Sequence, residues 1–167
     1  MKRLLLLRHA KSSWNDPGLA DHERSLAPRG RKAAKLLGRW LDEHGVQPEL
    51  VVCSSATRAQ QTLAVVAAAL GDPPSSIEDA LYAASADALL ARARALPNDA
   101  SSVLFVGHNP GLAELCLLLA RPGERLNRVA ENLPTGALAV LELDVDVWRA
   151  VEPGVAELVE LVLPREL

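Results

Sequence analysis

Three short apolar runs constrain the fold of this chain more than any other feature of its sequence. They are Leu4–Leu7, Leu50–Cys53 and Val103–Val106. Each has the length of a strand buried on both faces and is far too short to span a membrane. Segments with apolar residues at helical spacing lie between them, so strand and helix patterns alternate along the chain. Such alternation favours a sheet of mainly parallel strands covered by helices.

Helical segments and two further strands complete the predicted order. The stretch Pro73-Pro74-Ser75-Ser76 interrupts the helical pattern and is interpreted as a break. Ala137–Leu143 and Val155–Leu163 are predicted as the last two strands. The order β-α-β-α-α-β-α-β-β predicts an α/β fold, a three-layer α/β/α sandwich around a mostly parallel, mixed sheet. The predicted helices run from Pro28 to Gly45, from Ser54 or Ser55 to Gly71, from Ser85 to Pro97, and from Pro110 to Leu119.

The bulk properties are those of an ordinary globular enzyme or binding domain. The chain has 167 residues, 49% apolar and 23% charged, which predicts one domain over residues 1–167 with a core of its own. The net charge of −3 gives no reason to expect a nucleic-acid or membrane partner, so any anion site must be local. Cys53 and Cys116 are the only cysteines, which argues against a disulfide framework or a Cys-rich zinc site. Leu4–Leu7 is too short for a secretory signal, and we expect a cytoplasmic protein.

Basic residues follow each of the three apolar runs. They are Arg8 and His9 after the first run, Arg58 after the second and His108 after the third. If the strands are parallel, these residues meet at one edge of the sheet, where α/β proteins hold their ligands. A cation near a helix N-terminus opposes the macrodipole at a cost of about 0.3–1 kcal/mol, so placing Arg58 and His108 there suggests an anion between them.

A phosphoryl group fits this set of side chains. A neutral His9 imidazole supplies a lone pair for attack on phosphorus, and guanidinium groups hold anionic oxygens in two-point contact. The sequence therefore predicts a site in which Arg8, Arg58 and His108 surround a phosphate and His9 attacks it.

These motifs resemble the histidine phosphatase superfamily, which shares its fold with cofactor-dependent phosphoglycerate mutases. The combination of Arg8-His9-Ala10 with the later Gly107-His108 carries this resemblance, and it covers nearly the whole chain. Four longer phrases are similar to the SixA-type phosphohistidine phosphatase branch. They are Arg8-His9-Ala10-Lys11-Ser12, Ser54-Ser55-Ala56-Thr57-Arg58-Ala59-Gln60-Gln61-Thr62, Gly107-His108-Asn109-Pro110 and Pro134-Thr135-Gly136-Ala137.

The resemblance implies a phosphoglycerate mutase-like fold and a covalent mechanism. His9 would be phosphorylated in line, and water would cleave the phosphohistidine. Arg8, Arg58 and His108 would neutralise the charge on the phosphoryl oxygens. The family uses no metal, and no cofactor is expected.

One position departs from the family pattern. Ester-cleaving relatives carry an acidic general acid in a Leu-x-Glu context, and here that stretch is Leu81-Tyr82-Ala83. Other relatives place Asp directly after the second histidine, where this chain has Asn109. A departing alkoxide needs a proton, whereas an imidazole leaving group needs far less help. The missing acid therefore favours a phosphoramidate such as phosphohistidine, unless Glu78 or Asp79 serves as a displaced general acid.

Several other residues are weaker candidates for the site. Two interpretations are open for Lys11, Ser12 and Asn15, which either line the rim of the phosphate site or belong to a solvated loop. Asn109 is assigned to substrate binding together with these three residues. Thr135 and Gly136 are candidates for the pocket wall, and Trp14 for a binding face, while Trp40 is interpreted as core. Arg24 and Arg29 are expected to pair with neighbouring carboxylates.

The predicted function is a metal-independent phosphatase, most simply a SixA-like phosphohistidine phosphatase acting on a phosphorylated substrate, with a histidine-phosphorylated protein as the candidate partner. A broader small-molecule phosphomonoesterase or mutase is the first alternative. A non-catalytic phosphate-binding module is the second, and it would not need His9.

Overall fold

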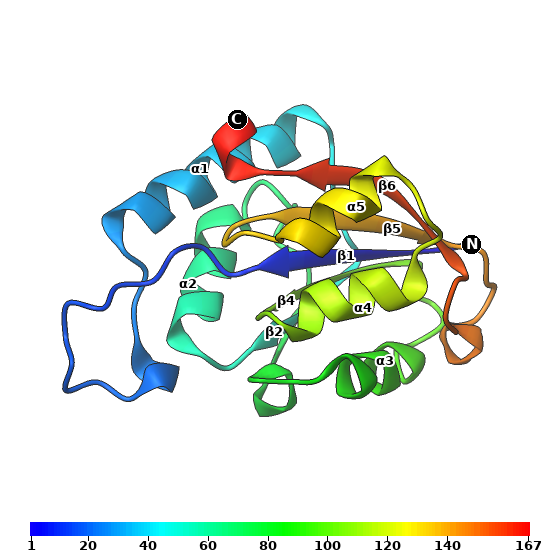
Figure 1. Ribbon diagram of the computed structural model, residues 1–167, viewed down its shortest axis with the longest axis horizontal. Coiled ribbons are helices and arrows are strands. Elements are labelled where there is room, and N and C mark those ends of the chain that lie inside the picture. Colours follow the sequence, from blue (N-terminus) through cyan, green and yellow to red (C-terminus); the bar gives the residue numbers. More distant parts are fainter.

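A six-stranded sheet runs through the computed structural model, which describes residues 1–167 (Figure 1). The strands lie in the order β3-β2-β4-β1-β5-β6. Strands β1, β2, β3 and β4 are parallel, β5 runs antiparallel to β1, and β6 antiparallel to β5. The mostly parallel, mixed sheet is therefore confirmed. The strands are β1 Lys2–Arg8, β2 Leu50–Ser54, β3 Ser75–Glu78, β4 Ser102–Gly107, β5 Leu138–Leu143 and β6 Ala156–Val162.

Helices cover both faces of the sheet, and this gives the three predicted layers. Helices α1 and α2 pack on one face, and α3, α4 and α5 on the other. Figure 1 shows α4 and α5 lying across the near face of the sheet. The helices are α1 Pro28–Glu43, α2 Thr57–Val66, α3 Ala86–Arg94, α4 Gly111–Leu119 and α5 Glu124–Glu131.

The opening run of leucines is continuous because its strand is central. Side chains of a strand alternate between its two faces. Leu4 and Leu6 belong to the core beneath α3, α4 and α5, and Leu5 and Leu7 belong to the core beneath α1 and α2. All four are at most 1% exposed. A strand covered on both sides has no polar face, so its sequence does not alternate.

Two elements were not predicted. Strand β3 follows directly on Pro74, whose carbonyl accepts a hydrogen bond from Val51 N–H at 2.9 Å. It is an edge strand paired only with β2, and proline is tolerated at such a position. Helix α5 buries only Leu126 and Val129, which is too few apolar residues to show a helical period.

Of the two predicted helix N-caps, one is confirmed and the other is wrong. Ser85 caps α3 as expected, accepting a hydrogen bond from Ala88 N–H at 3.1 Å. The residue at the N-cap of α2 is Ala56, without a side-chain cap, so the assignment of that role to Ser54 or Ser55 is wrong. The hydroxyl of Ser54 instead lies beside His108 at the end of the sheet.

The chain between β1 and α1 folds back on itself beside the end of β1. Ser12 bridges Leu26, and the N–H of Ala27 donates to the carbonyl of Lys11 at 2.9 Å. This closure places the short 3-10 turn Asp21–Glu23 next to the first turn of α2.

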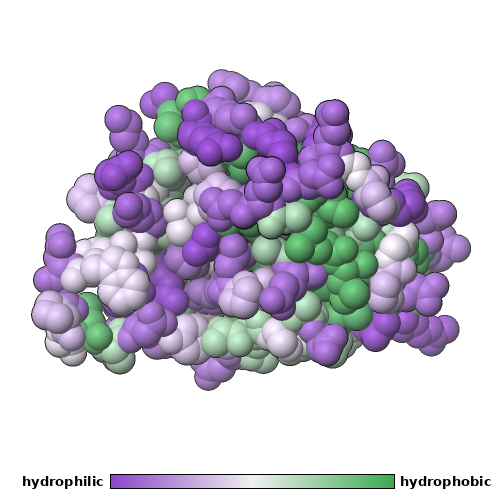
Figure 2. Space-filling model, viewed as in Figure 1, coloured by the Kyte–Doolittle hydropathy of each residue, from purple (hydrophilic) through white to green (hydrophobic).

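The surface is largely polar on the face shown in Figure 2, with an apolar area over α4. None of the helices combines the length and apolar character needed to cross a bilayer. No three His, Cys, Asp or Glu side chains gather as a metal site would require.

Candidate active site

A cavity of about 520 Å³ opens at the edge of the sheet where β1, β2 and β4 end. A backbone hydrogen bond holds the ends of β1 and β4 together, because the N–H of His9 donates to the carbonyl of Gly107 at 3.0 Å. Thirteen residues line the cavity, and cationic groups dominate its charge. Its titratable lining comprises Arg8, Lys11, Arg24, Arg58, His9, His108, Tyr82 and Asp21.

His9 is buried at the floor of this cavity, with 7% of its surface exposed. Its Nδ1 lies 2.7 Å from the carbonyl oxygen of Ala10. A carbonyl only accepts, so Nδ1 carries the proton and Nε2 keeps its lone pair. Consistent with this tautomer, Nε2 faces the Nε–H of Arg58 at 3.4 Å. Burial lowers the pKa of His9 to about 4, and the charges of Arg58, Arg8 and Arg24 add to the lowering while the bond to Ala10 opposes it. His9 is therefore neutral at neutral pH.

His108 lies beside His9, with the two ring centroids 5.1 Å apart. Its Nε2 is 2.7 Å from the hydroxyl of Ser54 at the end of β2, and its buried Nδ1 has no protein partner. Burial lowers the pKa of His108 to about 3, with further contributions from His9 and Arg58. One nitrogen is fixed by the sheet and the other is left for a ligand atom.

Arg58 is held by the turn that follows β1. Its Nη1 donates to the backbone carbonyl of Asp21 at 2.7 Å, and its Nη2 to the carboxylate Oδ2 at 3.0 Å. The same carboxylate accepts from Tyr82 O–H at 2.6 Å and from Arg24 Nη1 at 2.8 Å. The Tyr82 hydrogen bond, followed by those from Arg24 and Arg58, holds the pKa of Asp21 well below its usual range against the opposing effect of burial.

Hydrogen bonds to backbone groups also hold Arg8 and the chain just after His9. Arg8 donates through Nη1 to the carbonyl of Leu133 at 3.0 Å, and its Nε is buried without a protein partner. Burial and the nearby charge of Arg58 lower the pKa of Arg8. The hydroxyl of Thr62 accepts from Ala10 N–H at 3.0 Å and donates to the carbonyl of Arg58 at 2.8 Å. This one hydroxyl ties the residue after His9 to α2.

The four residues predicted to form the centre of the site, Arg8, His9, Arg58 and His108, all line this single cavity. The predicted rim is only partly present. Lys11 and Ser12 line the cavity, and the Ser12 hydroxyl accepts a hydrogen bond from Arg24. Asn15 is not part of the lining and is exposed, with its backbone N–H bound to the hydroxyl of Ser13.

Three further predicted residues lie just after β4 or just before β5. Thr135 lines the cavity. Gly136 does not line the cavity, and its N–H instead lies 3.0 Å from the carbonyl oxygens of Arg8 and His9. Asn109 also lines the cavity, but its amide is engaged by the carbonyl of Leu133 and the N–H of Ala113, as a residue that fixes the start of α4.

The hypothesis of a displaced acid at Glu78 or Asp79 needs correction. Neither residue lines the cavity. The Glu78 carboxylate is held by Arg92 of α3 through two hydrogen bonds of 2.7 and 2.9 Å, and it also accepts from the hydroxyl of Ser76. Asp79 is exposed at the start of the short turn after β3. Glu78 is thus engaged by Arg92 outside the cavity, and Asp79 is exposed to solvent.

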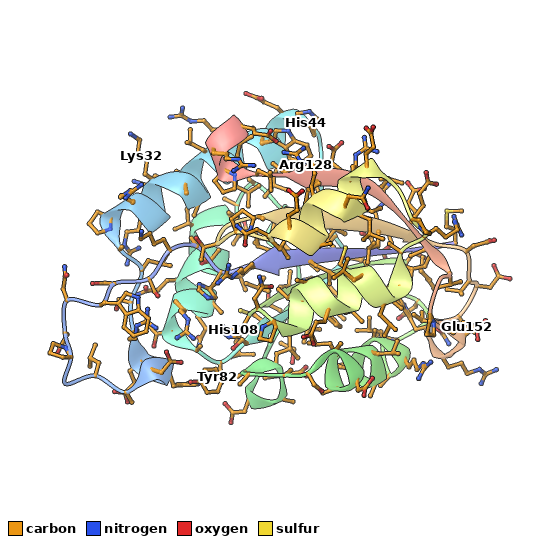
Figure 3. All side chains as sticks on the ribbon, in the orientation of Figure 1. Lys32, His44, Tyr82, His108, Arg128 and Glu152 are labelled. Carbon is orange, nitrogen blue, oxygen red and sulfur yellow. The ribbon has the colours of Figure 1, made fainter.

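Sequence reasoning missed part of the cavity wall. Arg24 does pair with a neighbouring carboxylate as expected, but the pair with Asp21 lies inside the cavity. The ring of Tyr82 packs edge-on against His108 with centroids 5.5 Å apart, and the two side chains lie close together in Figure 3. Trp14, the candidate for a binding face, lines the cavity, is 76% exposed and stacks on the guanidinium of Arg24. For Asp21 and Arg24, the only signal in the sequence was a cluster of charges in the long segment between β1 and α1.

Comparison with known proteins gives one consistent result. The sequence model of one protein family, the histidine phosphatase superfamily (branch 1), matches residues 4–82 of this chain. An uncharacterised protein of Mycobacterium tuberculosis, Rv1276c, is 38% identical over 163 residues, covering 95% of this chain and 100% of the relative.

Solved structures extend the likeness over the full fold. A structure assigned to the phosphohistidine phosphatase SixA of Nakamurella multipartitia has a TM-score of 0.81 and 35% identity, covering 98% of this chain and 96% of the other. The protein histidine phosphatase SixA in complex with tungstate has a TM-score of 0.79 and 25% identity, covering 98% of each chain.

Proposed function

Because this chain belongs to the histidine phosphatase superfamily, in its SixA-type branch and with a phosphoglycerate mutase-like fold, we propose that it is a phosphatase that removes the phosphoryl group from phosphohistidine on a protein. The observation that carries the proposal is a neutral, correctly tautomeric His9 at the floor of a cationic cavity whose only carboxylate is held ionised.

His9 is the nucleophile of this reaction. Its Nε2 forms a bond to phosphorus as the bond to the leaving group breaks, and the ring becomes cationic. The hydrogen bond from Nδ1–H to the carbonyl of Ala10 stabilises that charge. Water then attacks phosphorus, inorganic phosphate leaves, and His9 returns to its neutral state.

Arg8, Arg58 and His108 bind the phosphoryl oxygens. Arg8 offers its unpartnered Nε, and His108 its unpartnered Nδ1. Charge on the equatorial oxygens grows in the transition state, so donors fixed beforehand contribute most of the acceleration. Lys11 and Ser12 line the same cavity and are assigned to the rim of the substrate site.

The lack of a carboxyl group that could donate a proton in the cavity supports phosphohistidine as substrate over a phosphate ester. An ester releases a basic alkoxide that needs a proton in the transition state. Ala83 stands where ester-cleaving relatives carry a carboxylate, and it lines the cavity. Asp21 is the one carboxylate of the lining, and its lowered pKa leaves no proton to donate at neutral pH. An imidazole leaving group does not require such a donor.

The His9→Ala variant tests the nucleophile. We expect turnover to fall by at least about 10³, because the covalent route is removed. Wild-type enzyme mixed with ³²P-labelled substrate should give a protein-bound phosphate that is labile in acid and stable in base, mapped to His9. Thermal unfolding confirms that the variant is folded. Turnover near the wild-type rate in a folded variant would remove His9 from this role.

A substrate panel tests the chemical class. The value of kcat/KM is compared for a histidine-phosphorylated protein, N-phosphoimidazole, phenyl phosphate and a sugar phosphate. The proposal requires the two phosphoramidates to be preferred. A preference for the sugar phosphate would identify a small-molecule phosphomonoesterase instead, and absence of turnover with all four would favour the phosphate-binding module.

A further inference from the structure

Asp21 lines the cavity but takes no part in the attack of His9 or in the binding of the phosphoryl oxygens. It is the only acidic residue among the thirteen that line the cavity. The side chains of its partners Arg24 and Arg58 are each 8% exposed, whereas that of Asp21 is 48% exposed. The Asp21 carboxylate therefore lies nearer the opening than the nucleophile and the arginines do.

The carboxylate has one acceptor position left. A carboxylate offers about four lone-pair positions, two on each oxygen. Oδ2 accepts from Arg58 Nη2 and from Tyr82 O–H, and Oδ1 accepts only from Arg24 Nη1. The remaining position on Oδ1 belongs to a half-exposed side chain in the cavity wall, so a ligand N–H can reach it.

The direction of the reaction brings the leaving group to this part of the cavity. An in-line displacement places the leaving group opposite the attacking nitrogen. His9 attacks from the buried floor, so the leaving group departs toward the opening, where the wall includes Asp21.

We propose that Asp21 is a specificity-determining residue, which favours phosphohistidine by accepting a hydrogen bond from the ring N–H that is not bonded to phosphorus. This inference rests on the proposed function. The hydrogen bond keeps the phosphorylated ring cationic until the P–N bond breaks. His9 Nε2 forms its bond to phosphorus, the electron pair of the broken bond goes to the ring nitrogen, and the leaving ring departs as neutral imidazole with its other proton in place. Asp21 transfers no proton.

The same charge disfavours esters. A phenolate or alkoxide develops negative charge as it leaves, and an ionised carboxylate beside it raises the energy of that state. Hydrogen bonds from Tyr82, Arg24 and Arg58 keep Asp21 ionised, as its lowered pKa indicates. The carboxylate thus acts in opposite directions on the two classes of leaving group.

The test compares Asp21→Asn with wild type on N-phosphoimidazole and phenyl phosphate. The asparagine keeps the shape and one acceptor oxygen but removes the charge. We expect the ratio of kcat/KM for N-phosphoimidazole to that for phenyl phosphate to fall at least tenfold. The alkaline limb of kcat/KM for N-phosphoimidazole should also move to lower pH, because the cationic ring loses its stabilising partner.

Two controls separate this role from a structural one. Glu23→Gln removes the same charge from an exposed side chain of the same turn that does not line the cavity, and it should keep the wild-type ratio. Competitive inhibition by tungstate reports whether Arg58 is still positioned in Asp21→Asn, and we expect it to change less than fivefold.

The outcomes are distinct. An equal loss for both substrates, with weakened tungstate binding, would overturn the inference and leave Asp21 as a clamp for Arg58. An unchanged ratio would also overturn it. Failure of wild type to hydrolyse any phosphoramidate would instead contradict the proposed function, whatever the behaviour of Asp21→Asn.

Discussion

At the scale of single residues, the site is built on hydrogen bonds that assign each group one state. The carbonyl of Ala10 selects the tautomer of His9, the hydroxyl of Ser54 occupies one nitrogen of His108, and Asp21 orients Arg58. Burial keeps both imidazoles uncharged between the arginines. A protonated His9 would have no lone pair for attack, so the low dielectric of the cavity floor maintains the reactive form.

This arrangement predicts the pH at which the nucleophile is lost. Burial disfavours the charged ring, so His9 should protonate near pH 4 rather than near 6.5. NMR titration of its ring Cε1–H resonance measures the midpoint directly, and that of His108 should lie lower, near 3. His9→Gln identifies the resonance. A midpoint near 6.5 would contradict the burial argument.

The same shift has a consequence for stability. Between pH 6.5 and about 4 the unfolded chain binds a proton at this position and the native state does not. The free energy of unfolding should therefore fall as the pH drops through this window, by on the order of 3 kcal/mol from His9. Urea unfolding of wild type and His9→Gln across the window measures the difference.

At the scale of elements, the site depends on how α1 approaches the chain after β1. A Cβ atom at Gly30 in the first turn of α1 would overlap the carbonyl oxygen of Lys11, which is the acceptor for Ala27 N–H. Lys11 lies two residues after the nucleophile. The absence of a side chain at Gly30 therefore allows α1 to support the loop that carries the active-site wall.

Gly30→Ala should consequently impair both stability and activity. Forcing a methyl group against a backbone carbonyl costs about 1–3 kcal/mol, and the displaced loop should lower kcat/KM at least tenfold. Gly38→Ala is the matched control, because it lies in the same helix with no atom within 4 Å of the new Cβ. It should stabilise the protein by about 0.5–1 kcal/mol through helix propensity, with turnover retained.

Denaturant unfolding and steady-state kinetics of the two variants decide the matter. Equal behaviour of Gly30→Ala and Gly38→Ala would show that α1 does not set the position of the loop.

At the scale of the whole molecule, charge is distributed unevenly. The chain carries a net charge of −3, yet four cationic side chains line one cavity beside a single carboxylate. Burial lowers the pKa of Arg8, and the nearby charge of Arg58 lowers it further because the two cations repel each other. A bound oxyanion relieves this repulsion in the folded protein and has no comparable site in the unfolded chain.

Oxyanions should therefore raise the melting temperature. Binding to the native state alone stabilises it by RT ln(1 + [L]/Kd), about 2.7 kcal/mol at a hundredfold excess over Kd. Calorimetry with tungstate or inorganic phosphate measures this, with sodium chloride at equal ionic strength as the reference. Arg58→Met should lose most of the increase in Tm. An equal increase in that variant would place the anion elsewhere.

The sequence by itself determined three buried strands of the sheet and four of the side chains that line the cavity. Apolar runs without alternation identify buried strands, and the carboxyl ends of parallel strands must share one edge. Local patterns therefore sufficed to bring Arg8, His9, Arg58 and His108 together.

Only the tertiary structure decided the rest of the wall. Asp21 contacts Arg58 across 37 positions and Tyr82 across 61, and no local pattern encodes which turn of a loop folds over which helix. For the same reason Glu78 could not be separated from the site until Arg92 was seen to hold it. Residues placed by strand geometry could be predicted from the sequence, whereas those placed by long-range hydrogen bonds could not.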